Sequence, residues 1–265
     1  MERYGIIGFG RIGQRIAARL RGPDAPELAA VLVRPEQALA ARAACGEAAV
    51  CLDLDAFLAH RPDVAVECAS AAALAAHGPA LLAAGIDLAP LSLAAFADPE
   101  VEARLRAASV AGPGRIELAA GAMATIDFLA TAREDSLQRV VFRAAYPPAR
   151  WRGTPAEAMI DLGRVEGREL FFRGTARETA RLFPRNLNVC VGVALAGLGL
   201  DETEVELLAD ASLRQAWFEV EALAAAGSVL LRVGPRDAPV GEDPVDHTTF
   251  SVMAVLRRRR ARIAI

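Results

Sequence analysis

A glycine-rich hexapeptide near the start of the chain, Gly8-Phe-Gly-Arg-Ile-Gly13, constrains the fold more than any other feature. Residues 4–8 have the length and apolar character of a buried strand, and residues 11–20 carry apolar side chains at helical spacing. A strand, a glycine-rich turn and a helix in this order are typical of a dinucleotide-binding βαβ unit, in which the glycines allow a tight turn, close approach of a pyrophosphate and close helix packing. The alternative is a turn that needs glycine without any ligand. The cofactor-binding residues predicted in this turn are Gly8, Gly10, Arg11, Ile12 and Gly13.

Strands alternate with helices through the first 120 residues. This alternation predicts an α/β fold with a Rossmann-type, doubly wound parallel sheet, so we assign residues 1–120 to a dinucleotide-binding domain. His77 is interpreted as a structural residue of an alanine-rich helix. Strands are expected at 4–8, 28–33, 64–69, 87–91 and 116–119, and helices at 11–20, 38–44, 72–84 and 99–108.

The pattern of predicted elements changes after Gly121, where strand-like segments follow one another with fewer helices between them. This pattern predicts a second α+β domain with a mixed sheet over residues 121–244. The C-terminal residues 245–265 are predicted to pack back on the first domain, as a helix followed by a strand. Strands are expected at 140–144, 169–172, 204–208, 218–222 and 229–233, and a helix at 188–198.

Composition narrows the function classes. A net charge of −3, with one short basic run near the C-terminus, predicts no nucleic-acid partner, and the alanine-rich stretch at 69–86 is too weakly apolar to predict a membrane span. The four cysteines lack metal-ligand spacing, so we expect no metal and no disulfide framework. All 30 Lys+Arg residues are arginine, which excludes Schiff-base chemistry on lysine. A start without a basic segment or a cleavage site favours the cytoplasm.

Arg34 follows the second predicted strand, where a site that prefers NAD usually carries an acidic residue for the ribose hydroxyl. An arginine at this position can bind a 2′-phosphate, so the sequence favours NADP somewhat over NAD. The alternatives for Arg34 are a surface residue or one that stacks on adenine.

Several strings resemble the L-aspartate dehydrogenase family in order and spacing over nearly the whole chain. They are Val66-Glu-Cys-Ala69, Gly121-Ala122, Tyr146-Pro-Pro-Ala-Arg-Trp151, Phe172-Arg-Gly-Thr-Ala-Arg-Glu178, Phe183-Pro-Arg-Asn-Leu-Asn188 and Leu195-Ala-Gly-Leu-Gly-Leu-Asp201.

The resemblance implies oxidative deamination of L-aspartate, with hydride passing to NAD or NADP, in a homo-oligomer that is usually a dimer. It also implies that Ala122 and Asn188 contact the cofactor, and Ala69, at the end of the Val66–Ala69 string, is predicted as a further cofactor-binding residue. An asparagine amide both donates and accepts, which suits a nicotinamide carboxamide or a ribose. A helix N-cap ahead of Val189 is the alternative for Asn188, and the two roles do not exclude each other.

This chain departs from the residues that the resemblance implies. Phe218 stands where the family has its catalytic histidine, Ala216 where it has an asparagine, and Tyr146 where it has a lysine. Residues 243–247 replace a family Asn-Pro-Lys-Thr-Ser segment with Asp-Pro-Val-Asp-His. Because phenylalanine cannot transfer a proton, and losing an acid–base group costs about 10²- to 10⁴-fold in rate, we expect an altered substrate or direction. The catalytic residues predicted to take over are His247 and Tyr146, and for each the alternative is a surface or packed residue.

Three functions therefore remain open. The first is an NAD(P)-dependent amino-acid dehydrogenase or imine reductase, in which hydride delivery to a preformed iminium needs little acid–base help. The second is an NAD(P)-binding protein without redox turnover, and the third is a non-redox enzyme on the same scaffold.

Overall fold

The computed structural model describes residues 2–21, 26–46, 48–119, 121, 125–134, 136–184, 187–234 and 247–263. The chain divides into two compact units. The first comprises residues 1–119 and 246–265, and the second comprises residues 120–245.

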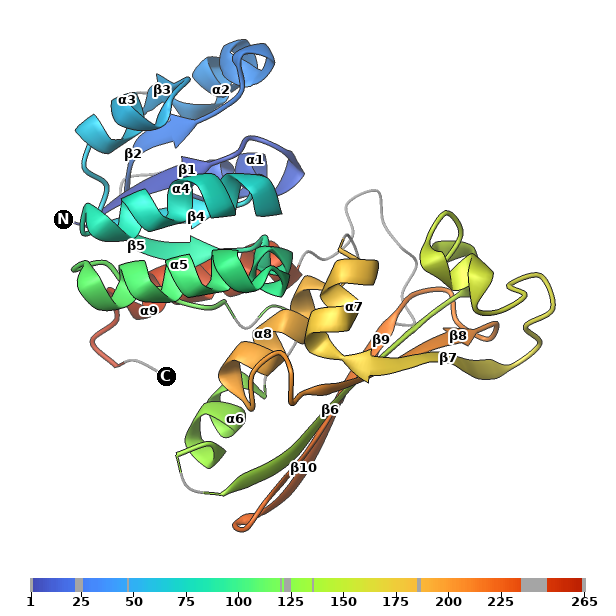
Figure 1. Cartoon of the computed structure of the whole chain (residues 1–265). Helices are drawn as coiled ribbons and strands as arrows, with labels where there is room; N and C mark the ends of the chain where they lie inside the picture. Colours follow the sequence, from blue (N-terminus) through green and yellow to red (C-terminus); the bar gives the residue numbers. More distant parts are fainter. Residues whose placement is uncertain are drawn as a thin grey trace. The chain divides into compact units, whose positions relative to one another are not determined.

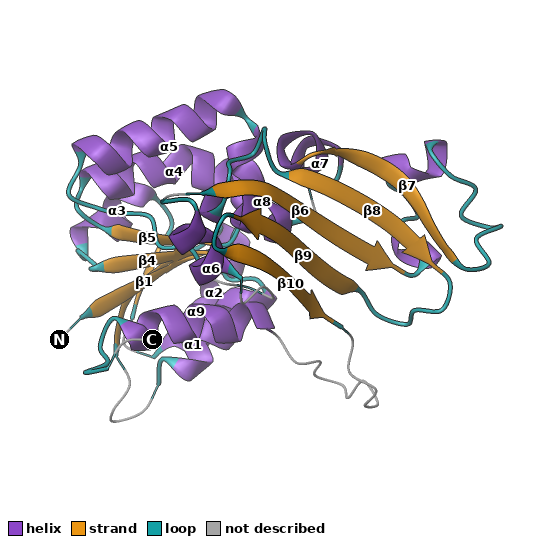
Figure 2. Cartoon of the chain, turned by 90° about the horizontal axis from the view of Figure 1, so that it is seen from below, coloured by secondary structure: helices purple, strands orange, loops and turns teal. Residues whose placement is uncertain are grey.

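The first unit is built on a five-stranded parallel sheet with the order β3-β2-β1-β4-β5. Figure 2 shows α3, α4 and α5 on one face of this sheet and α1, α2 and α9 on the other. This arrangement confirms the predicted doubly wound sheet, whose strand order reverses between β1 and β4. The strands are β1 (Arg3–Ile7), β2 (Glu27–Leu32), β3 (Ala49–Cys51), β4 (Val64–Glu67) and β5 (Asp87–Pro90). The helices are α1 (Arg11–Arg19), η1 (Pro35–Gln37), α2 (Ala38–Cys45), α3 (Leu54–Ala59), α4 (Ala71–Ala83), η2 (Leu93–Ala97), α5 (Pro99–Ala111) and α9 (His247–Arg258).

Two predicted strands of this unit are wrong. Residues 116–119 form only an isolated bridge, between Leu88 and Ile116. A longer ladder would need an N–H group two residues further along β5, and that residue is Pro90, which has none. The strand expected after the C-terminal helix is absent from residues 259–263, where the N–H groups of Arg260 and Ala261 bond back to carbonyls three residues earlier, and residues 264–265 lie outside the described part.

The C-terminal helix α9 packs within the first unit. Val252, Val255 and Leu256 are buried in the same cluster as Tyr4 and Ile16. The Tyr4 hydroxyl also donates to the Leu256 carbonyl at 3.2 Å. The hydrophobic core of the first unit therefore includes residues from both ends of the chain.

The second unit is a mixed five-stranded sheet with the order β10-β9-β6-β8-β7. Its pairs are antiparallel except for β6 with β8, and Figure 1 shows α6, α7 and α8 along one side of the sheet. The predicted α+β mixed-sheet domain is thus confirmed. The strands are β6 (Leu137–Tyr146), β7 (Arg168–Thr175), β8 (Glu204–Asp210), β9 (Trp217–Ala224) and β10 (Gly227–Val233). The helices are α6 (Ile126–Ala132), η3 (Pro148–Arg150), η4 (Pro155–Ala158), α7 (Ala176–Leu182) and α8 (Asn188–Ala196).

Candidate functional site

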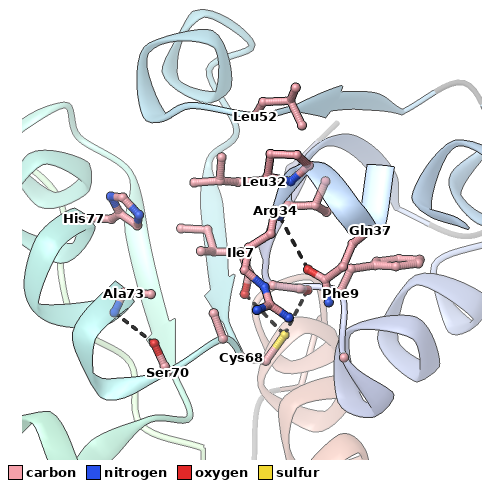
Figure 3. A pocket seen from close by; sticks show the side chains of 15 residues that line it. Ile7, Phe9, Leu32, Arg34, Gln37, Leu52, Cys68, Ser70, Ala73 and His77 are labelled. Carbon is pink, nitrogen blue, oxygen red and sulfur yellow. Dashed lines mark hydrogen bonds between the residues drawn. The ribbon is translucent and has the colours of Figure 1, made fainter. Parts of the chain in front are cut away.

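A pocket of about 510 Å³ opens in the first unit at the carboxyl ends of β1, β2 and β4. This is the reversal point of the strand order, where open α/β sheets bind ligands. Figure 3 shows Ser70, Ala73 and His77 of the α4 segment on one side of the pocket and Phe9, Arg34 and Gln37 on another. The lining residues are Ile7, Gly8, Phe9, Gly10, Leu32, Val33, Arg34, Pro35, Gln37, Leu52, Cys68, Ala69, Ser70, Ala73 and His77.

The glycine-rich turn has a different steric reason for each glycine. Gly8 has a φ of +97°, and a Cβ there would lie 2.8 Å from the Cα of Ala69. A Cβ on Gly13 would lie 2.3 Å from the Gly8 carbonyl oxygen. A Cβ on Gly10 would meet no atom within 4 Å, so the space beside this residue is open to a ligand. Gly8 and Gly13 are therefore required by the fold itself, whereas Gly10 is not.

The N-terminus of α1 suits an anion. Its N-cap is Gly10, which provides no side-chain cap, and its first turn contains no acidic residue. The first N–H groups of a helix lack partners within the helix and carry the positive end of its dipole. Together with the open space at Gly10, these groups fit a dinucleotide pyrophosphate.

Arg34 lies at the mouth of the pocket, two residues beyond the C-terminal end of β2. Its guanidinium contacts the Glu36 carboxylate at 3.1 Å, and its side chain is 74% exposed. Its backbone N–H donates to the Gln37 side chain at 3.4 Å, which helps to fix the turn into η1. An exposed ion pair of this kind contributes about 0 to 1 kcal/mol, so a doubly charged phosphate can compete for this arginine.

His77 is a pocket residue that the sequence interpretation missed. The sequence predicts a structural role for it in an alanine-rich helix, whereas its imidazole lies on the pocket wall (Figure 3). The spacing of Ser70, Ala73 and His77 marks a single helix face and could have suggested this placement. Burial lowers the pKa of His77, which favours a neutral ring over a cation.

Tyr146 and Phe218 are neighbours in the second unit. Their rings meet edge to face with centroids 5.8 Å apart, and Phe218 also stacks on Phe142 at 6.0 Å. The Trp151 ring also meets the Tyr146 ring edge to face, with centroids 5.0 Å apart. Burial raises the pKa of Tyr146 to about 12, so its phenol is protonated at neutral pH. It can therefore donate a hydrogen bond, but it is a weaker acid than an ordinary tyrosine.

The remaining predicted residues are distributed over both units. His247 is exposed at the start of α9, in the first unit. Asn188 is the first residue of α8 in the second unit, and its N-cap interpretation is wrong, because the N-cap is Leu187. Ala122 lies outside the described residues.

Two features are absent from the described part of the chain. No group of three or more His, Cys, Asp or Glu side chains within it is placed to hold a metal ion. None of its helices combines the length and apolar character needed to cross a bilayer.

Comparisons with known proteins match the whole chain. A family model for the C-terminal region of aspartate dehydrogenase matches residues 127–259. A model for the NAD binding domain of homoserine dehydrogenase matches residues 8–119.

Similar proteins carry related descriptions. An L-aspartate dehydrogenase of Ruegeria pomeroyi is 38% identical over 261 residues, covering 98% of this chain and 94% of the relative. An L-aspartate dehydrogenase of Serratia proteamaculans is 35% identical over 260 residues, covering 98% and 97%. A crystal structure of aspartate dehydrogenase from Thermotoga maritima has a TM-score of 0.77 with 19% identity and covers 100% of this chain and 99% of that chain.

Proposed function

The chain belongs to the L-aspartate dehydrogenase family, as its motifs predict, and from this premise we propose that it is an NAD(P)-dependent amino-acid dehydrogenase. The reaction transfers hydride to or from the carbon that bears nitrogen in an amino acid or its imine. The observation that carries the proposal is the pocket at the glycine-rich turn, where open space at Gly10 adjoins the uncapped N-terminus of α1.

The pocket residues divide the work of holding the cofactor. The backbone N–H groups of Arg11, Ile12 and Gly13, in the first turn of α1 beside the pocket, are proposed to bind the pyrophosphate, and Ala69 lines the pocket. The family resemblance implies that Ala122 and Asn188 also contact the cofactor. A bound nicotinamide dinucleotide supplies or accepts the hydride, and the residues of this chain bind and orient it.

NADP is the proposed cofactor in preference to NAD. Arg34 follows β2, the strand whose end meets the adenosine ribose in this fold. No described acidic residue lines the pocket at this point, and Glu36 holds the Arg34 guanidinium only in an exposed pair. An arginine binds a phosphate through two parallel charge-assisted hydrogen bonds, which supports recognition of a 2′-phosphate.

Reduction of an imine is the proposed direction. Phe218 occupies the position of the family's histidine and packs against Phe142 and Tyr146, so it moves no proton. Hydride addition to a protonated imine gives the amine without activating a water molecule. Tyr146, protonated at neutral pH, is the proposed donor of a proton to the imine nitrogen as hydride adds to the neighbouring carbon and makes that nitrogen basic, and His247 is the second candidate.

A protein that binds the dinucleotide without turnover is the second candidate function. The packing of Phe218 favours it, because an apolar ring fills the place of a proton-transfer group. The test is to measure NADPH oxidation with preformed imines, with 2-oxo acids plus ammonia, and with oxaloacetate plus ammonia. Turnover on any of them supports the dehydrogenase, whereas tight NADPH binding without turnover on all of them supports the second candidate.

A homodimer is proposed, with the face of the second sheet that lies opposite its helices as its interface. Strand register places Leu170, Leu223 and Leu230 on the face of Arg143, and all three leucines are exposed. Leu223 and Leu230 lie on neighbouring strands, whereas Leu170 lies on the opposite edge strand, so the homodimer is proposed mainly from the family resemblance, with a second copy of the chain as the occupant of this face.

The cytoplasm is the proposed compartment. All four cysteines, Cys45, Cys51, Cys68 and Cys190, are free thiols, which supports a reducing environment.

A further inference from the structure

Glu67 is a buried carboxylate at the end of β4, and the chemistry proposed above does not use it. Its side chain is 1% exposed. It accepts four hydrogen bonds. Oε1 accepts from the Ala69 N–H at 2.8 Å, the Ser70 N–H at 3.0 Å and the Ser92 hydroxyl at 2.9 Å, and Oε2 accepts from the Ser92 N–H at 3.1 Å.

These bonds join two loops that follow neighbouring strands. Ala69 and Ser70 lie between β4 and α4, and Ser92 lies between β5 and η2. Three of the four partners are backbone N–H groups, which can only donate, and each carboxylate oxygen faces at least one of them. An ionised carboxylate accepts at both oxygens, whereas an amide would direct an NH₂ group at another donor.

The first of these loops determines the width of the pocket. Cys68, Ala69 and Ser70 line it, and the Ala69 backbone lies so close to Gly8 that a Cβ on the glycine would come within 2.9 Å of the Ala69 nitrogen. The Cys68 thiol bonds to the Gly8 carbonyl oxygen at 3.4 Å on the same side. A shift of residues 68–70 therefore moves the wall that faces the glycine-rich turn.

We propose that Glu67 is a positioning residue of the dinucleotide site, holding residues 68–70 at the distance from the glycine-rich turn that the cofactor requires. This inference rests on the proposed function. It adds a residue that touches no cofactor and acts through the backbone of Ala69 and Ser70. Burial raises the pKa of the Glu67 carboxyl, and the four donors oppose that rise and favour the charged form.

The test compares Glu67→Gln with a control variant that also loses hydrogen bonds of a buried side chain. Tyr4→Phe is the control, because it removes hydroxyl bonds to Glu2 and Leu256 near the amino end of β1, away from the lining residues. The Kd for NADPH is measured by its fluorescence at a temperature where both variants are folded. Glu67→Gln is expected to raise the Kd about 10-fold or more, from the cost of an unsatisfied buried donor. Tyr4→Phe is expected to leave it within about 2-fold of the wild type.

Ser92→Ala provides a second measurement if Glu67→Gln fails to fold. It removes one of the four donors and keeps the Ser92 N–H, so the Kd is expected to rise about 2- to 5-fold. The inference is overturned if Tyr4→Phe raises the Kd as much as Glu67→Gln and Ser92→Ala do for the same loss in melting temperature. Failure of the wild type to bind NADPH or NADH would instead contradict the proposed function, so the two failures are distinguishable.

Discussion

At the scale of single residues, Gly10 separates the needs of the fold from those of the cofactor. Nothing lies within 4 Å of a Cβ built on Gly10, and its φ of −77° is ordinary for any residue. Gly10→Ala is therefore expected to change the free energy of unfolding by less than about 1 kcal/mol. The same methyl group would occupy the proposed pyrophosphate position and weaken NADPH binding at least about 10-fold.

The control for this prediction is Gly167→Ala. Gly167 also has open space at its Cβ but lies in the second unit. Thermal unfolding and NADPH titration of both variants check the result. Unchanged affinity in Gly10→Ala would contradict the assignment of the turn.

Arg34 tests the proposed preference for the phosphorylated dinucleotide. Arg34→Ala removes the guanidinium that is proposed to bind the 2′-phosphate, and it breaks only an exposed pair with Glu36. The Kd for NADPH is expected to rise about 10- to 100-fold while that for NADH changes less than about 3-fold. An equal change for both dinucleotides would mean that Arg34 does not read the phosphate.

Tyr146 tests the proposed proton donor. Tyr146→Phe keeps the ring between Trp151 and Phe218 and removes only the hydroxyl. Turnover in imine reduction is expected to fall about 10- to 100-fold, the lower part of the range for general acids, without a matching change in NADPH affinity. Unchanged turnover would assign Tyr146 to packing alone and leave His247 as the candidate.

The raised pKa of Tyr146 also predicts a pH dependence. A phenol whose folded pKa of about 12 exceeds its ordinary value near 10 stabilises the fold below pH 10 and loses that contribution as pH rises through 12. The melting temperature of the wild type should therefore fall more between pH 9 and pH 11 than that of Tyr146→Phe. This comparison is made by calorimetry on the two proteins side by side.

At the scale of elements, α9 depends on a cluster of charges at its end. The Arg259 guanidinium bonds to Glu2 at 2.7 Å and to Asp87 at 2.8 Å, and it also contacts Glu117. Only 13% of the Arg259 side chain is exposed, so the pairs are weakly screened. Removing the Arg259 cation would leave Glu2, Asp87 and Glu117 with Arg115, which contacts only Asp87 and Glu117 among them.

Arg259→Gln is therefore expected to destabilise the first unit by about 2 kcal/mol, less than a fully buried pair would lose. Amide hydrogen exchange in α9 is expected to rise with it. The control is the neighbouring Arg258→Gln, which replaces an exposed arginine and should change neither quantity. If both variants lose the same stability, the loss comes from the change in net charge and not from the contacts of Arg259 with the three carboxylates.

The sequence predicts most helices and strands because the spacing of apolar residues and the residues at turns agree with the final fold. The Asp98-Pro99 pair predicts the start of α5, and the Asp98 carboxylate does accept from the Glu100 N–H at 2.9 Å. The two wrong strands were predicted from apolar runs alone. Their absence follows from Pro90 in the neighbouring strand and from the turns after α9, which are tertiary and local constraints outside a periodicity pattern.

The pocket was predictable only in part. The glycine-rich turn is recognisable from the sequence. His77, by contrast, lies in the middle of α4, and Glu67 acts through hydrogen bonds to loops that follow two different strands. Such roles depend on which segments meet in space. A helical face at 70, 73 and 77 could have suggested the first of them, but no sequence signal indicates the second.

At the scale of the whole molecule, the proposed homodimer is the feature open to the simplest test. Leu230→Asp places a charge on a leucine that is 65% exposed on the second sheet. It is expected to shift the protein from dimer to monomer in size-exclusion chromatography with light scattering. Leu39→Asp, at a leucine that is 80% exposed on α2, is the control and should leave the mass unchanged. A monomeric wild type would contradict the proposal directly.

The most direct test of the central claim is titration of the wild-type protein with NADPH and with NADH, followed by melting of each mixture. The account predicts saturable binding of one dinucleotide per chain, tighter for NADPH, and stabilisation of about 2.7 kcal/mol at a ligand concentration of 100 times the Kd. If neither dinucleotide changes the fluorescence or the melting temperature, the glycine-rich turn does not bind a pyrophosphate and the proposed dehydrogenase function is wrong.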